Sequence, residues 1–126
     1  IFLYSPINVK AQTWIYIGTN ENGQITYLKK NSIKDLGNNR KSAWTKFELK
    51  NKKYYENGKY RIIPTLIYTT LSEYDCTNNT IKDLKLIVKE PDGKVLFNET
   101  KKESEQKATF IPEDALGRSI LKYLCN

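Results

Sequence analysis

The sequence predicts an α+β fold in which an antiparallel sheet of about six strands carries one C-terminal helix, with one disulfide between them. Residues 62–76 form a long run rich in β-branched and aromatic side chains, without helical spacing, which is typical of a strand. Residues 112–124 instead repeat apolar side chains at helical spacing. The two cysteines, Cys76 and Cys125, lie at the ends of these two segments, so we expect a bridge between a central strand and the terminal helix.

The length of 126 residues is enough for one domain with a modest core. Aromatic residues make up 12% of the chain, which argues against disorder because they supply the burial that offsets chain entropy. No apolar run approaches the roughly 18 residues that a membrane-spanning helix needs. We expect residues 1–12, interrupted by Pro6, to be an N-terminal extension, either an edge strand or a loose end, and residues 13–126 to form a single domain.

The chain is basic, with a net charge of +7 from 21 basic and 14 acidic residues. This charge favours polyanionic partners, although lysines that only keep the protein soluble would give the same total. Two cysteines without metal-ligand spacing indicate a disulfide and an oxidising compartment. The bridge would contribute about 4 kcal/mol in the chain-entropy account. Because the sequence begins at Ile1 without Met, we expect a mature or trimmed form whose targeting segment lies upstream.

The first two strands are predicted at residues 13–19 and 24–28. They are joined by the turn NENG, whose Asn22-Gly23 pair suits the positive φ angles of a tight hairpin. The polar connector at residues 29–39 contains Ser32 and Ile33, which we expect to hold it against the sheet.

The third strand is predicted at residues 40–49 and leaves Trp44 on its more polar face. Either a bulge switches the register of this strand, or both faces of the sheet are partly covered.

The segment 50–61 combines the highest density of charge with several tyrosines and is predicted to be a loop. Its lysines and tyrosines alternate in a way that can bind a sulfated glycan, an acidic protein or single-stranded nucleic acid through charge and stacking. The alternative is a mobile, solvated hairpin without a binding role. Pro64, which follows, suits the start of a strand or an edge position. The candidate binding residues are Lys52, Lys53, Tyr54, Tyr55, Lys59 and Arg61.

Two further strands are predicted at residues 80–90 and 95–99, joined by the turn Pro91-Asp92-Gly93, and residues 107–111 add a short one. The outward side of the first of these strands carries Lys85, Ile87 and Lys89.

The helix is predicted from Pro112 to Leu124, with acidic residues at its start and Lys122 near its end, as the helix dipole favours. Gly117 weakens this helix by about 1 kcal/mol but lets it approach the sheet closely.

Enzymatic chemistry is not expected. The chain has no histidine, which excludes His-based triads and His metal sites. Glu73 and Asp75 share one face of a strand, whereas the two carboxylates of a glycosidase lie across a cleft. We therefore expect no catalytic residues, no metal and no cofactor.

Five stretches, TWIYIG, ITYLKKNSI, RKSAWTKFEL, LSEYDC and FIPEDALGRSILKYLC, occur in an order that resembles the bacterial surface-adhesin E family. The resemblance covers about residues 13–125. It implies a sheet of about six strands, a helix packed on it and a bridge between Cys76 and Cys125. It also implies an adhesin that binds host matrix proteins such as vitronectin and laminin. The chain departs from the family pattern in the segment 50–61 and in a shorter link before the helix, so no binding surface is carried over residue by residue.

We expect an exported bacterial binding protein, located in the periplasm, on the outer-membrane surface or secreted, that contacts a host matrix protein or another acidic partner. A sulfated glycan is a further candidate partner, and nucleic acid is not expected. The alternatives are an envelope accessory subunit that docks through a sheet edge, which includes a homodimer, and an enzyme inhibitor.

Overall fold

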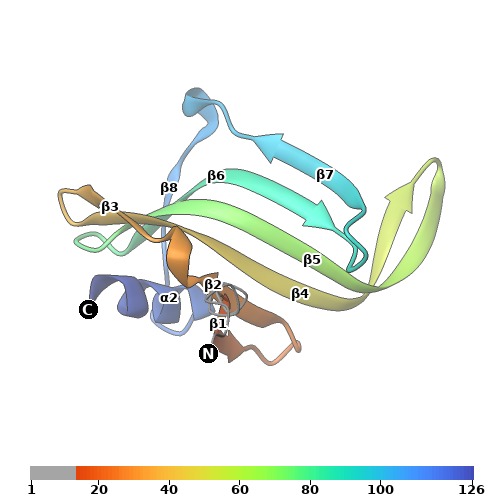
Figure 1. Cartoon of the computed structure of the whole chain (residues 1–126), viewed down its shortest axis with the longest axis horizontal. Helices are drawn as coiled ribbons and strands as arrows, with labels where there is room; N and C mark the ends of the chain where they lie inside the picture. The colour runs from red at the N-terminus through yellow and green to blue at the C-terminus, as the bar shows by residue number, and fades with distance from the viewer. Residues whose placement is uncertain (1–13) are drawn as a thin grey trace, which may run out of the picture.

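The computed structural model describes residues 14–126, whose strands form one curled antiparallel sheet (Figure 1). Its main path runs β1-β2-β4-β5-β6-β7, while β3 pairs with β4 and β8 pairs with β6. The α+β class is confirmed: six strands form the main path, and two short strands extend it. The strands are β1 (Trp14–Thr19), β2 (Ile25–Lys29), β3 (Lys34–Gly37), β4 (Arg40–Glu56), β5 (Lys59–Asp75), β6 (Thr80–Lys89), β7 (Val95–Thr100) and β8 (Ala108–Phe110). The predicted N-terminal extension lies outside the described residues.

The connections follow the turn chemistry of the sequence. The first hairpin is confirmed, but the positive φ predicted for Asn22 is wrong: only Gly23 of this pair has one, at 79°. Asn20 Oδ1 closes the turn by accepting hydrogen bonds from the backbone N–H groups of Asn22 at 2.9 Å and Gln24 at 3.0 Å. The connector to β4 contains a 3-10 turn, η1 (Lys30–Ser32), and the short strand β3. Ser32 Oγ accepts a hydrogen bond from the backbone N–H of Trp44 at 2.9 Å. The prediction that this serine holds the connector on the sheet is thus confirmed.

The predicted loop at 50–61 is wrong, because these residues continue β4 and β5 as strands of 17 residues each. The two strands pair from Arg40 opposite Asp75 to Glu56 opposite Lys59 and turn at Asn57-Gly58, where φ is 53° and 78°. Two adjacent positive φ angles are the signature of a tight hairpin turn, which Asn-Gly favours. High charge density does not prevent strand formation here, because each strand pairs with the other along the hairpin and the lysine side chains stay exposed.

The outer part of this hairpin, residues 50–65, is called the arm. Pairing between β5 and β6 begins at Ile67, so the arm strands pair only with each other. Figure 1 shows the arm extending beyond the other strands at the right of the view. Pro64 therefore lies at an edge on its β6 side, as predicted, although within a strand and not at its start.

Helix α2 (Leu116–Cys125) packs on one face of the sheet and is shorter than predicted. Residues 112–115 form a turn instead, closed by the Ala115 N–H donating to the Pro112 carbonyl at 3.1 Å. A Cβ on Gly117 would lie 3.1 Å from Ile111 Cγ2, so glycine permits close contact with the residue that follows β8, whereas close approach to a strand at Gly117 stays a prediction. The core beneath the helix consists of Leu28, Ala43, Tyr74, Ile111, Ile120, Leu121 and Leu124.

The disulfide joins Cys76, just after β5, to Cys125, the last residue of α2, with their Cα atoms 5.8 Å apart. The backbone N–H of Cys76 also donates to the Asn39 carbonyl at 2.9 Å. The predicted tie between the long strand and the terminal helix is therefore present, and it closes the end of the core opposite to the arm (Figure 1).

A second core cluster lies between the helix and the arm, where Ile63, Leu66 and Val88 are buried beside Tyr54 and Leu96. The β4–β5 register runs unbroken past Trp44, which is half-buried on the face away from the helix. Of the two alternatives for Trp44, partial cover of both faces is therefore correct and a register switch is wrong. Among residues 14–126, no helix has both the length and the apolar character that a membrane span requires.

Candidate functional site

The six candidate binding residues all lie on the arm, but they divide into inward and outward groups. Tyr54 packs on the second core cluster, and its hydroxyl lies 3.4 Å from the Leu96 carbonyl. Arg61 pairs with Glu90 at 2.6 Å and with Glu56 at 3.2 Å. The hydrogen bond to Glu90 is the main cause of the raised pKa of Arg61. Tyr54 and Arg61 thus fasten the arm to the sheet.

The outward face of the arm carries side chains that make few contacts. Tyr55 and Tyr60 are 59% and 68% exposed, and their rings meet edge to face at 4.9 Å between centroids. The Lys53 ammonium lies 5.6 Å from the Tyr60 ring centroid. Ile62, paired opposite Lys53, is 66% exposed. This face therefore presents an apolar and aromatic patch with Lys53 beside it. Lys52 and Lys59 are also exposed, but their pairing with Ile63 and Glu56 places them on the opposite face of the arm.

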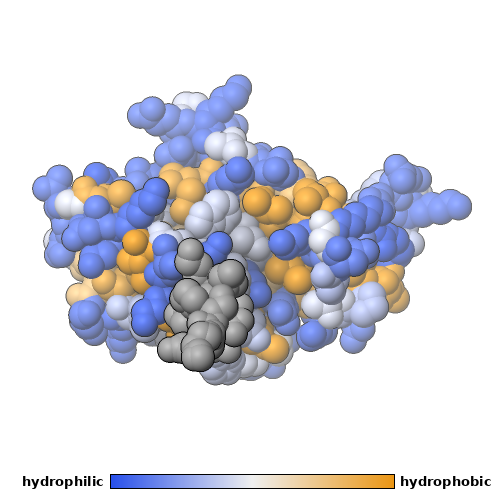
Figure 2. All heavy atoms as spheres, in the orientation of Figure 1, coloured by the Kyte–Doolittle hydropathy of each residue, from blue (hydrophilic) through white to orange (hydrophobic). Residues whose placement is uncertain are grey.

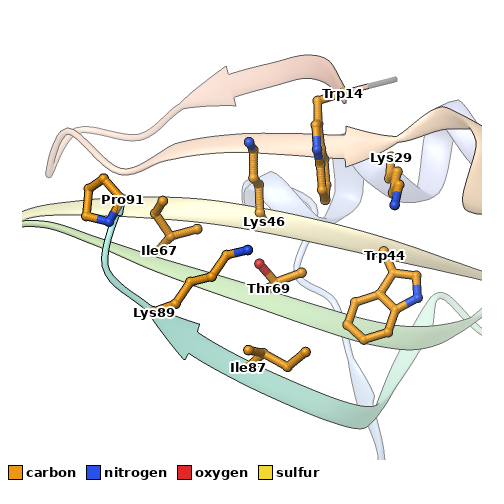
Figure 3. A pocket seen from close by; sticks show the side chains of 9 residues that line it. All are labelled: Trp14, Lys29, Trp44, Lys46, Ile67, Thr69, Ile87, Lys89 and Pro91. Carbon is orange, nitrogen blue, oxygen red and sulfur yellow. The ribbon is translucent and has the colours of Figure 1, made fainter. Parts of the chain in front are cut away.

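A second surface, which sequence reasoning missed, lies on the sheet face away from the helix. A hollow of about 380 Å³ opens there, lined from β1, β2, β4, β5, β6 and the turn after β6 (Figure 3). This size falls within the roughly 300–1,000 Å³ of small-ligand sites. We call it the lysine groove; it is lined by Trp14, Lys29, Trp44, Lys46, Ile67, Thr69, Ile87, Lys89 and Pro91.

The lysine groove combines cations with indole rings. The Lys46 ammonium lies 4.6 Å from the Trp14 ring centroid and 5.2 Å from that of Tyr27, and the Lys29 ammonium lies 5.9 Å from Trp14. Such pairs contribute roughly 0.5–1 kcal/mol each at exposed sites. The rings hold the lysines over the sheet without neutralising them.

The lining of the groove contains no carboxylate. Among the ion pairs of residues 14–126, none involves Lys29, Lys46 or Lys89. A smaller neighbouring hollow of about 330 Å³ shares Lys29 and Trp44 and adds Lys34, again without an acidic residue. The positive charge of this face is therefore not offset by its own lining.

Alternation within each strand offered a signal for this surface. Lys46 follows Trp44 by two residues, and Lys89 follows Ile87 by two, so each pair shares a face. The strand register then places Lys46 opposite Tyr27 and Lys89 opposite Ile67. Without that register, nothing in the sequence shows that lysines from three strands line one hollow together with both tryptophans.

Glu73 and Asp75, the carboxylates that share one strand face, both make contacts that stabilise the fold. Glu73 forms an ion pair with Arg40 at 2.7 Å. Asp75 accepts hydrogen bonds from the backbone N–H groups of Asn78 at 3.0 Å and Thr77 at 2.9 Å, and from the Asn78 side chain at 2.9 Å. These bonds, led by the Asn78 backbone, lower the pKa of Asp75. Within residues 14–126, no group of three His, Cys, Asp or Glu side chains is arranged to hold a metal ion.

The far end of the arm is mainly hydrophilic in Figure 2, whereas hydrophobic residues occur in several places over the rest of the visible face. The arm and the lysine groove thus differ in chemistry: the arm is a projecting aromatic patch, and the groove is a cationic hollow.

Comparison with known proteins gives a consistent result. The model of the surface-adhesin protein E family matches residues 14–126. Among solved structures, crystal form II of Haemophilus influenzae protein E is similar, with a TM-score of 0.62 and 14% identity over 99% of this chain and 95% of that one. The selenomethionine form of the same protein gives a TM-score of 0.57 and 12% identity, covering 87% and 84% of the two chains. At these identities the structures establish a shared fold. Among curated proteins, none matches the sequence.

Proposed function

Because the chain belongs to the surface-adhesin protein E family, we propose that it is an exported, non-enzymatic bacterial adhesin that uses its arm to bind a host matrix protein or another acidic protein. Its place is the outer-membrane surface, the periplasm or the medium. The observation that carries the proposal is the outward face of the arm, where two tyrosines and Ile62 are more than half exposed beside Lys53.

Physical chemistry supports a protein partner at this face. Exposed aromatic side chains are frequent energetic centres of protein interfaces, and they are effective when a polar rim surrounds them. Tyr55 and Tyr60 would be such a centre, with Lys53 beside them and with Lys52 and Lys59 exposed on the other face of the same narrow hairpin. The lysines would speed encounter with an acidic surface, and their effect would weaken as salt increases.

The test changes the exposed lysines of the arm and leaves unchanged the residues that hold the arm on the sheet. A variant with Lys52→Glu, Lys53→Glu and Lys59→Glu retains Arg61, which the fold needs. We expect it to lose binding to immobilised vitronectin or laminin. The matched control, with Lys102→Glu, Lys107→Glu and Lys122→Glu, has the same net charge but alters exposed lysines away from the arm. Equal binding by both variants would show that the arm is not the contact surface.

A second candidate function is docking through a sheet edge, in an envelope assembly or a homodimer. Strand β7 pairs on one side only, with β6, and its residues Val95 and Phe97 are 54% and 43% exposed. An exposed apolar edge strand favours association. Light scattering at low and high salt distinguishes this case, because an edge dimer persists in salt whereas a charge-driven contact weakens.

A further inference from the structure

We propose that the lysine groove binds an acidic oligosaccharide, a sulfated or uronic-acid glycan, whose acid groups contact the lysines while a sugar ring stacks on tryptophan. This site is separate from the arm, and it would act in addition to the protein contact proposed above. The proposal is argued from the charge, size and spacing of the groove.

The charge of the groove favours an anionic occupant. Lys29, Lys46 and Lys89 come from three different strands and line one hollow (Figure 3). None of them forms an ion pair within the described residues, and the lining holds no carboxylate. Like charges gathered in a partly enclosed hollow raise the local potential, which attracts a counter-charge. An anion that bridged these lysines would remove their mutual repulsion.

The size of the groove favours ring-sized groups over a protein surface. A standard protein interface buries about 800 Å² on each partner, which needs a broad surface. The groove is a hollow of about 380 Å³ and shares Lys29 and Trp44 with a neighbouring hollow of about 330 Å³. Two adjacent hollows along one sheet face suit a short linear chain of rings.

The spacing of charge and ring distinguishes a glycan from nucleic acid. The Lys46 ammonium already lies over the Trp14 ring, 4.6 Å from its centroid, so a sugar would stack on Trp44 in the same hollow. Lys46 lies two residues from Trp44 on the same strand face, so one ligand unit must present its acid group beside its stacking face. In a uronic acid or a sulfated sugar, the acid group is attached directly to the ring whose C–H face stacks on an indole. In a nucleotide, the sugar separates the phosphate from the stacking base.

The groove also supplies its own reporter. Trp14 and Trp44 are the two tryptophans of the chain, and both line the groove. Intrinsic tryptophan fluorescence therefore responds to this site and carries no direct signal from the arm. We expect a saturable change when a heparin-derived tetrasaccharide is added to the full chain at low salt. A fully desulfated and carboxyl-reduced tetrasaccharide of equal length should give none.

The matched variants are two pairs of lysine-to-glutamine substitutions with equal net charge. We expect Lys46→Gln with Lys89→Gln to weaken binding about tenfold, which corresponds to about 1.4 kcal/mol. Lys53→Gln with Lys59→Gln, on the arm, should leave the affinity for the tetrasaccharide unchanged. Circular dichroism checks that each variant is folded, and calorimetry repeats the titration in case Lys46→Gln changes the fluorescence of Trp14.

Two outcomes would overturn the proposal. One is equal weakening by the groove and arm pairs, because the tetrasaccharide would then respond only to net charge. The other is tighter binding of a single-stranded oligonucleotide of matched charge, which would make the groove a nucleic-acid site. Loss of matrix-protein binding in the arm variant alone, with tetrasaccharide binding intact, would show that the two proposals stand or fall separately.

Discussion

Asn51 lies opposite Pro64 at the one point between Arg40 and Glu56 where the β4–β5 ladder lacks a pair. The register is the same on both sides, with Lys50 opposite Thr65 and Lys52 opposite Ile63. Proline has no N–H to donate, and Asn51 has a left-handed φ of 51°. Beyond this point, the alternating side chains of the hairpin lie on the opposite faces from those that strict alternation would give.

The exchange is visible in burial. Under strict alternation Tyr54 would share the outer face of Trp44 and Lys46, yet it packs with Leu66 in the second core cluster. Ile63 is buried in the same cluster, three residues from Leu66. The kink at Asn51 thus turns Tyr54 toward the core and Tyr55 toward solvent.

The first prediction concerns this kink. Asn51→Gly should change the free energy of unfolding little, because glycine adopts positive φ without strain. Asn51→Val should cost about 1–2 kcal/mol, since a β-branched residue is strained in that region. Urea unfolding measures both, and Lys52→Val, at an exposed neighbouring strand position, is the control. Similar losses for the two valine variants would show that φ at residue 51 is not the cause.

The second prediction concerns the disulfide. Replacing Cys76 and Cys125 together by serine should lower the free energy of unfolding by about 2–4 kcal/mol, because the unfolded chain regains the freedom of a loop spanning 49 residues. Chemical denaturation with and without reductant measures this. Reductant should destabilise the native chain by a similar amount and leave the double variant unchanged; a native chain indifferent to reductant contradicts the prediction.

The third prediction concerns pH. Hydrogen bonds hold the folded pKa of Asp75 below its ordinary value of about 3.9, so the folded state binds the proton less readily than the unfolded state. This stabilisation is fully present above that value and is lost as pH falls through the folded pKa. Asp75→Asn should therefore unfold at lower urea than the native chain at neutral pH, and the gap should narrow in acid. Asp114→Asn, at an exposed position, should show no comparable gap.

The fourth prediction concerns the helix. Gly117→Val should destabilise the protein by about 1–3 kcal/mol more than Ser119→Val, because the new side chain meets Ile111 at the core whereas residue 119 is exposed. Both variants place valine within α2, and loss of glycine at position 117 by itself favours the helix, so a larger loss of stability in the Gly117→Val variant reports the contact with Ile111. Equal melting midpoints of the two variants would mean that the helix moves away from Ile111 without loss of stability.

The sequence was most informative where local chemistry decides structure. The turn before Gln24, the alternation in residues 40–49 and the apolar helical face each indicated their element, and the cysteines indicated how two of them join. The helix start was predicted too early because a proline and two acidic residues also suit the turn that precedes Leu116.

Two features, the arm and the lysine groove, depend on how strands pair with one another. The arm was predicted as a loop because its charges suggested solvent on both sides, although the turn signal Asn57-Gly58 was present. The lysine groove depends on pairing across β2, β4, β5 and β6, which brings Lys29, Lys46 and Lys89 together. A single strand cannot indicate which residues of another strand will lie beside it.

The independent pairing of the arm beyond Ile67 has an evolutionary consequence. Inserting one residue into each strand at the tip would lengthen its reach by about 3.4 Å and exchange which side chains point outward there, whereas two per strand would preserve the pattern. The length of the arm can therefore change in steps of two residues per strand without altering the helix, the disulfide or the lysine groove.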